Sequence, residues 1–94
     1  MITKKQVQKV SYDVMSCAIE VHKYLGPGLL KSIYQACLVQ ELRLNNFLVK
    51  EQLEVPIIYK GIQIKDPLRL DILVNDLIIV EVKSVENLLP VHHA

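Results

Sequence analysis

The sequence predicts an α+β fold in which two N-terminal helices pack on a mostly antiparallel sheet of three to four strands. In the first half of the chain, apolar residues recur every three or four positions, as they do on one face of a helix. In the second half, β-branched residues alternate with polar ones or form short runs, which is typical of strands. With 94 residues, the chain is expected to form one small domain, residues 1–94, with a thin core.

The first predicted helix runs from Lys4 to Leu25. Its apolar face consists of Val7, Val10, Val14, Ala18, Val21 and Leu25. Gly26-Pro27-Gly28 ends this helix, because glycine supplies left-handed backbone angles and proline cannot continue the helix. A second helix is expected from about Leu30 to Asn46, where two asparagines tolerate turn geometry.

Beyond Phe47 the apolar period changes to that of strands. Alternating residues around Tyr59 are followed by a turn at Lys60-Gly61 and by a break at Asp66-Pro67. Two runs rich in β-branched residues, 68–74 and 77–83, then flank the polar pair Asn75-Asp76. This pattern predicts a β-hairpin.

Composition excludes few classes of protein. The formal net charge is +1, which argues mildly against a stand-alone nucleic-acid binder but leaves room for a local basic patch. The N-terminus lacks the apolar core of a signal peptide, and no apolar run approaches the ~20 residues of a membrane span, so a cytoplasmic protein without membrane contact is predicted. Cys17 and Cys37 are expected to be buried, reduced thiols.

Three charged residues stand inside the most apolar part of the chain: Asp71, Glu81 and Lys83. A buried carboxylate without a partner is costly, so such groups are normally paired or bound to a metal ion. Glu81 and Lys83 are two apart on a strand and therefore share a face. If the hairpin brings Asp71 beside them, the two carboxylates could hold Mg²⁺, and Lys83 could assist an attacking water or stabilise the transition state.

Loop length tests this hypothesis. A two-residue loop at Asn75-Asp76 would place Asp71 opposite Val80 and leave Glu81 on the other face. The two carboxylates can meet only if the loop holds an odd number of residues or a strand carries a bulge, and we predict one of these. The alternative is that Asp71, Glu81 and Lys83 form only the solvated face of a hairpin, and the three residues alone favour it.

Several segments, in order, resemble the GxxExxY protein family of the PD-(D/E)XK nuclease superfamily. They are Ala18–Leu30, Ser32-Ile33-Tyr34, Tyr59-Lys60-Gly61, Arg69-Leu70-Asp71, Val80–Val85 and Leu88–His92. The resemblance implies a restriction-endonuclease-like core and hydrolysis of nucleic acid with Mg²⁺ or Mn²⁺. It also implies that Asp71 and Glu81 are metal ligands and that Lys83 is the catalytic lysine.

The chain departs from that family in two places. Lys31 stands where the family motif has Glu; its ammonium either takes the place of the cation beside Asp71 and Glu81 or points to solvent. Family members also continue beyond the Leu-Pro-Val-His segment, so a shortened C-terminus, without the last helix and strand, is expected. Two hypotheses therefore stay open: a metal-dependent phosphodiester hydrolase, and an inactive nuclease-fold domain that acts through binding or self-association.

The sequence also makes predictions about self-association and about the three histidines. An exposed sheet edge and a missing second layer predict a homo-oligomer, most simply a dimer. His22 is expected to pack at the end of the first helix, and His92-His93 to form a frayed tail, with no zinc site among them.

Overall fold

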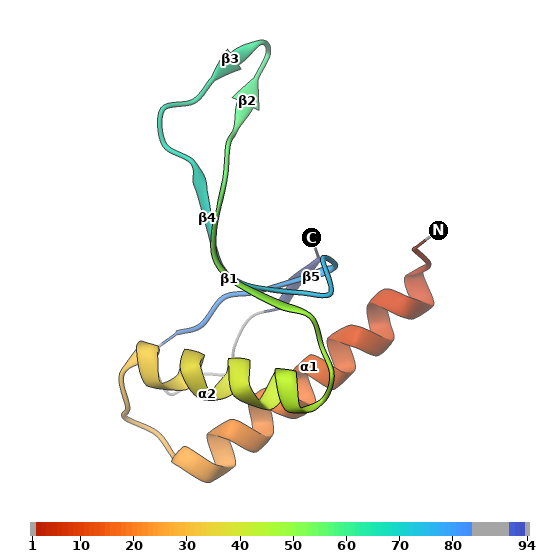
Figure 1. Cartoon of the computed structure of the whole chain (residues 1–94), viewed down its shortest axis with the longest axis vertical. Helices are drawn as coiled ribbons and strands as arrows, with labels where there is room; N and C mark the ends of the chain where they lie inside the picture. The colour runs from red at the N-terminus through yellow and green to blue at the C-terminus, as the bar shows by residue number, and fades with distance from the viewer. Residues whose placement is uncertain (1, 84–90, 94) are drawn as a thin grey trace.

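The computed structural model describes residues 2–83 and 91–93 (Figure 1). Within these residues two helices come first and the strands follow them, as the sequence predicts. The elements are α1 Lys4–Leu25, α2 Lys31–Leu44, β1 Val49–Val55, β2 Ile58–Tyr59, β3 Ile62–Gln63, β4 Leu68–Val74, β5 Ile78–Val80 and β6 Val91–His93. No helix in the described part of the chain is long and apolar enough to cross a membrane.

Helix α1 has the predicted bounds, and both of its ends follow from local sequence. Thr3 accepts a hydrogen bond from the backbone of Gln6, whose side chain accepts one from the backbone of Thr3, and this reciprocal pair satisfies two free amides. At the other end, Gly26 takes a φ of 75°, which glycine adopts without steric cost.

Helix α2 begins one residue later and ends two residues earlier than predicted. Its start is fixed by Tyr34, whose hydroxyl donates to the carbonyl of Gly26 and accepts from the amide of Leu29 at 3.2 Å. His22 of α1 stacks on the Tyr34 ring, with ring centroids 6.2 Å apart, so the expected packing role of this histidine is confirmed. The loop between the helices is thus tied to the first turn of α2.

The main sheet has the order β1-β4-β5-β6 and is antiparallel throughout. Strand β1 was not predicted, because its only buried residue is Val49 and the rest of the strand is largely polar. The prediction of a frayed tail at His92-His93 is wrong: these residues belong to β6, which pairs with β5. Both segments are strands because their backbones pair with a neighbouring strand, and side-chain polarity is a poor guide to such pairing.

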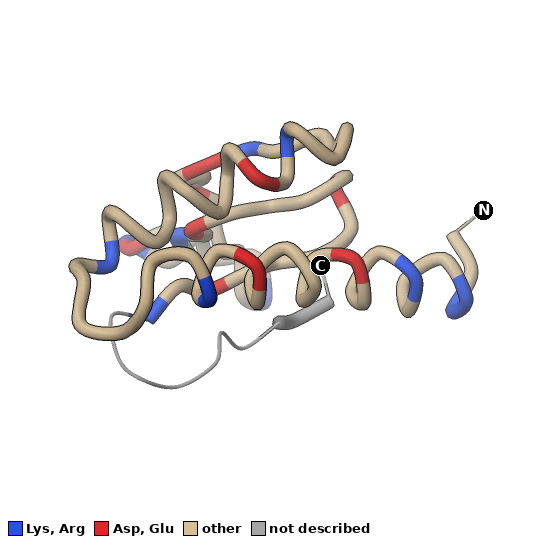
Figure 2. Tube along the Cα trace, turned by 90° about the horizontal axis from the view of Figure 1, so that it is seen from below, with Lys and Arg blue, Asp and Glu red and all other residues tan. Residues whose placement is uncertain are grey.

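Both helices contribute to the core against the sheet, and Figure 2 shows them side by side, with basic and acidic positions interspersed along them. The sheet residues that face the core alternate along their strands. They are Ile72 and Val74 in β4, Ile78 and Val80 in β5, and Val82 beyond it. Both cysteines are free thiols, but only Cys17 is buried as expected, whereas Cys37 is half-buried.

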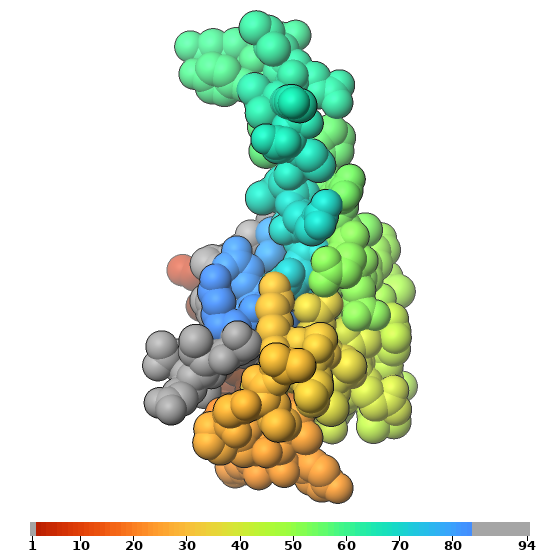
Figure 3. Space-filling view, turned by 90° about the vertical axis from the view of Figure 1, so that its left-hand side faces the viewer, coloured from red at the N-terminus to blue at the C-terminus, as the bar shows by residue number. Residues whose placement is uncertain are grey.

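Strands β2 and β3 form a separate hairpin arm that projects from the body of the domain (Figures 1 and 3). Its turn lies at Lys60 and Gly61, as predicted, with φ angles of 48° and 83°. The arm exposes several large apolar side chains. These are Ile58, Tyr59 and Ile62 most fully, and Ile57 and Ile64 to a lesser degree.

Candidate functional site

The β4–β5 hairpin has a three-residue loop, so the prediction of an odd number of loop residues is confirmed. Val74 pairs with Ile78 and Ile72 with Val80, which leaves Asn75, Asp76 and Leu77 between the strands. Asn75 and Asp76 both have a φ of 52°, a conformation that these two residue types tolerate better than most. If this register were continued by one step beyond the end of β5, it would put Asp71 opposite Glu81.

The carboxylate of Asp71 lies against the segment that carries the other two candidate residues. Its Oδ2 accepts a hydrogen bond of 3.1 Å from the backbone amide of Val82, which stands between Glu81 and Lys83. The Asp71 side chain is only 16% exposed. Glu81 and Lys83 are more open to solvent, and Lys83 Nζ lies 3.8 Å from Glu81 Oε2. The hairpin therefore brings the Asp71 carboxylate to the backbone between Glu81 and Lys83, and those two side chains lie near each other.

Regular strand pairing is interrupted on both sides of Asp71. On one side, the pairing of β1 with β4 skips the position where Gln52 faces Asp71, and Gln52 has a φ of 49°. On the other side, β5 ends at Val80, before it reaches Glu81. Unusual backbone conformations in non-glycine residues tend to gather at functional sites. Nothing in the sequence points to Gln52, because glutamine carries no turn signal.

Lys31 settles the choice that the sequence left open. Its ammonium lies 3.0 Å from Asp71 Oδ2 and 3.2 Å from Asp71 Oδ1, so it spans the carboxylate. The interpretation in which Lys31 points to solvent is therefore wrong. Figure 3 shows the start of α2, in yellow, beside the end of the β5 segment, in blue.

The donor set fits a hard divalent cation, with one condition. Asp71 and Glu81 offer carboxylate oxygens, which Mg²⁺ and Mn²⁺ prefer, and Mg²⁺ commonly completes its shell with waters and substrate phosphate. Within residues 2–83 and 91–93 there is no group of three acidic, histidine or cysteine side chains arranged to hold a metal ion. The residues fit a metal held by two carboxylates, provided that Lys31 leaves Asp71.

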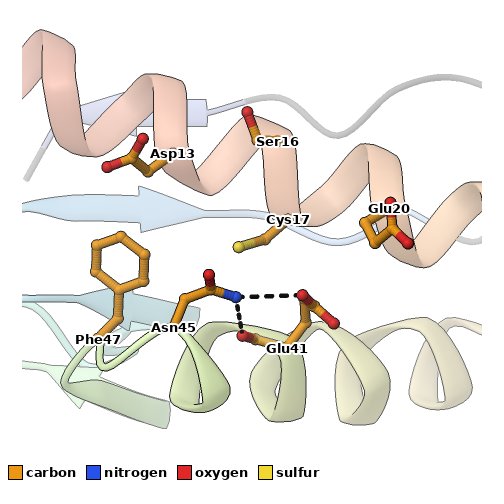
Figure 4. A pocket seen from close by; sticks show the side chains of 7 residues that line it. All are labelled: Asp13, Ser16, Cys17, Glu20, Glu41, Asn45 and Phe47. Carbon is orange, nitrogen blue, oxygen red and sulfur yellow. Dashed lines mark hydrogen bonds between the residues drawn. The ribbon is translucent and has the colours of Figure 1, made fainter.

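A separate hollow between the helices is unsuited to phosphate chemistry (Figure 4). It has a volume of about 510 Å³, and its lining includes the carboxylates Asp13, Glu20 and Glu41, which would repel a polyanion. Burial raises the pKa of the Cys17 thiol there, and the Glu41 and Asp13 carboxylates add to the effect. A raised pKa keeps the thiol protonated and poorly nucleophilic, so this hollow is not a candidate active site.

The fold and the charge cluster together define an α+β protein with a restriction-endonuclease-like core. The family model of the PD-(D/E)XK nuclease superfamily matches residues 8–94, so the chain belongs to that superfamily. No curated protein and no solved structure matches the chain.

Proposed function

We propose that this protein hydrolyses phosphodiester bonds of nucleic acid with a divalent metal ion, Mg²⁺ or Mn²⁺. The observation that carries the proposal is the hydrogen bond from the Val82 amide to Asp71, which brings this carboxylate to the segment of Glu81 and Lys83. Membership of a nuclease superfamily, whose members generally depend on divalent metal, supports the same reaction.

Each of the three residues has a distinct role in this proposal. Asp71 and Glu81 hold the metal, which, when bound, supplies positive charge to the scissile phosphate. Lys83 shares the face of Glu81 and is half exposed, so its ammonium is free to turn toward substrate. There the ammonium orients the attacking water or offsets the charge that develops on the phosphate oxygens, and only the neutral amine form would accept a proton from the water.

Within the superfamily, we propose that the chain is a GxxExxY protein in which Lys31 replaces the motif glutamate. The support is the ordered set of matching segments and the position of Lys31 beside Asp71, where a carboxylate would face the metal. A cytoplasmic location and a single domain also stay predictions.

Hydrolysis can be tested with the Glu81→Gln variant. We expect the wild-type chain to cleave labelled DNA or RNA with Mn²⁺ or Mg²⁺, and we expect EDTA to stop this cleavage. The rate of the Glu81→Gln variant should be lower by at least about a hundredfold, because a neutral amide is a poor metal ligand. Glu54→Gln is the matched control, since Glu54 is an exposed carboxylate paired with Arg69 at 2.9 Å. Cleavage that survives in Glu81→Gln would contradict the proposal. A wild-type chain that cleaves neither substrate would instead favour the inactive, binding-only domain.

Self-association is a second prediction, and the hairpin arm supports it. Ile58, Tyr59 and Ile62 are 61–69% exposed, and a two-stranded hairpin is barely stable alone in water, so we expect two copies to bury these arms against each other. Light scattering at tens of micromolar (roughly the range of weak association) should show a dimer. Ile58→Lys with Ile62→Lys should give a monomer, whereas Tyr12→Lys on the exposed face of α1 should not. A monodisperse wild-type monomer would rule this interface out.

A further inference from the structure

Lys31 makes an unusual contact for a residue at the start of a helix. It is the first residue of α2, and its ammonium spans both carboxylate oxygens of Asp71, 40 positions further along the chain. The lysine side chain is 46% exposed, whereas that of Asp71 is 16% exposed. The cation therefore reaches inward from a partly open position to a largely enclosed anion.

The position of Lys31 is unfavourable without that partner. The first turn of a helix carries the positive end of the helix dipole, where acidic side chains stabilise and basic ones destabilise. Helix α2 has no acidic residue in its first turn, and its N-cap, Leu30, contributes no side-chain hydrogen bond. Asp71 supplies the missing negative charge beside the ammonium of Lys31.

The Lys31 ammonium can leave Asp71 without disturbing the elements around it. Because its stem is long and its end is partly solvent-exposed, the ammonium can turn away into water while the helix stays in place. The helix itself is held by Tyr34, whose hydroxyl contacts the backbone of both Gly26 and Leu29. Asp71 also accepts a hydrogen bond from the Val82 amide, which does not involve Lys31 and orients the carboxylate independently of it.

We propose that Lys31 is a tethered cation that competes with the divalent metal for Asp71. This inference rests on the proposed function, because it takes Asp71 as a metal ligand. In the resting protein the ammonium neutralises this carboxylate, and a metal ion binds only by displacing it. Breaking the Lys31–Asp71 ion pair therefore reduces the free energy of metal binding. Lys31 is thus the residue that sets the metal concentration at which the site fills.

The test is calorimetric titration of the whole chain with Mn²⁺, a readout independent of activity. Lys31→Met removes the charge and keeps the length of the side chain, and we expect it to lower the Kd for Mn²⁺ by about tenfold. Lys31→Arg keeps the charge and should bind Mn²⁺ as weakly as the wild type. Lys50→Met is the matched control: Lys50 is 47% exposed and pairs with Asp76 at 2.7 Å, so its loss removes the same charge and the same kind of ion pair elsewhere.

The outcomes separate this inference from the proposed function. If wild-type binding is abolished by Asp71→Asn but Lys31→Met binds no tighter than Lys50→Met, competition is refuted and the metal site stands. If neither the wild type nor Lys31→Met binds Mn²⁺, both the competition and the metal site are refuted. We expect Lys31→Met to bind Mn²⁺ more tightly than the wild type, and Lys31→Arg and Lys50→Met not to do so. Adding Asp71→Asn to Lys31→Met should abolish this binding.

Discussion

Asp71→Asn should lower the rate of metal-dependent phosphodiester hydrolysis by at least about a hundredfold. The substitution removes the negative charge that the metal requires and retains a side-chain carbonyl that can still accept from the Val82 amide. The lost ion pair with Lys31 is partly exposed, so it contributes little to folding stability. The effect is therefore expected in the chemistry and not in the fold. Initial rates on a labelled substrate, with circular dichroism of the same sample, measure both.

Asp76→Asn is the control for this variant. Asp76 lies in the loop of the same hairpin and pairs with Lys50, and its φ of 52° is one that asparagine adopts readily. It changes the net charge by the same amount at a site outside the cluster. Equal losses in the two variants would show that charge alone matters, and an unimpaired Asp71→Asn protein would remove Asp71 from the active site.

Leu42→Ala should destabilise the folded protein by about 2–5 kcal/mol. Leu42 is 0% exposed and packs in the core between the helices and the sheet, so its truncation leaves a cavity. Natural domains are stable by only about 5–15 kcal/mol, and one of this size has few other core residues to compensate. We expect a drop in the melting temperature of about 10 °C or more, measured by circular dichroism and confirmed by urea titration.

Leu44→Ala provides the comparison on the same helix. Leu44 is the last residue of α2 and is 66% exposed, so the same chemical change should cost no more than about 0.5 kcal/mol. Similar losses from the two leucines would contradict the packing described for α2.

The helices and the central hairpin could be predicted because their signals are local. The apolar period of α1, its capping residues and the glycine after it are all contained within 24 consecutive residues, Thr3–Gly26. The β4–β5 hairpin likewise joins two neighbouring apolar runs. Strand β1 lacks such a signal, because it lies at the edge of the sheet with one buried residue, and only its pairing with β4 defines it.

The sequence singles out the candidate residues but not their surroundings. Asp71, Glu81 and Lys83 stand out as charges among apolar neighbours, and the loop has the odd number of residues that was expected, which brings Asp71 to the Val82 amide. The strained backbone at Gln52 and the choice of Lys31 between Asp71 and solvent depend on how separate elements meet. No local pattern encodes those contacts.

The sequence by itself determined which charged residues lie within apolar segments, where the first helix begins and ends, and that the hairpin loop had to be odd for two acids to meet. Only the tertiary structure decided that the first residue of α2 neutralises Asp71 and that the β2–β3 arm stands away from the body. The physical reason is range. Helix periodicity and turn preferences act between near neighbours, whereas an ion pair across 40 positions exists only once the sheet and the helices have packed.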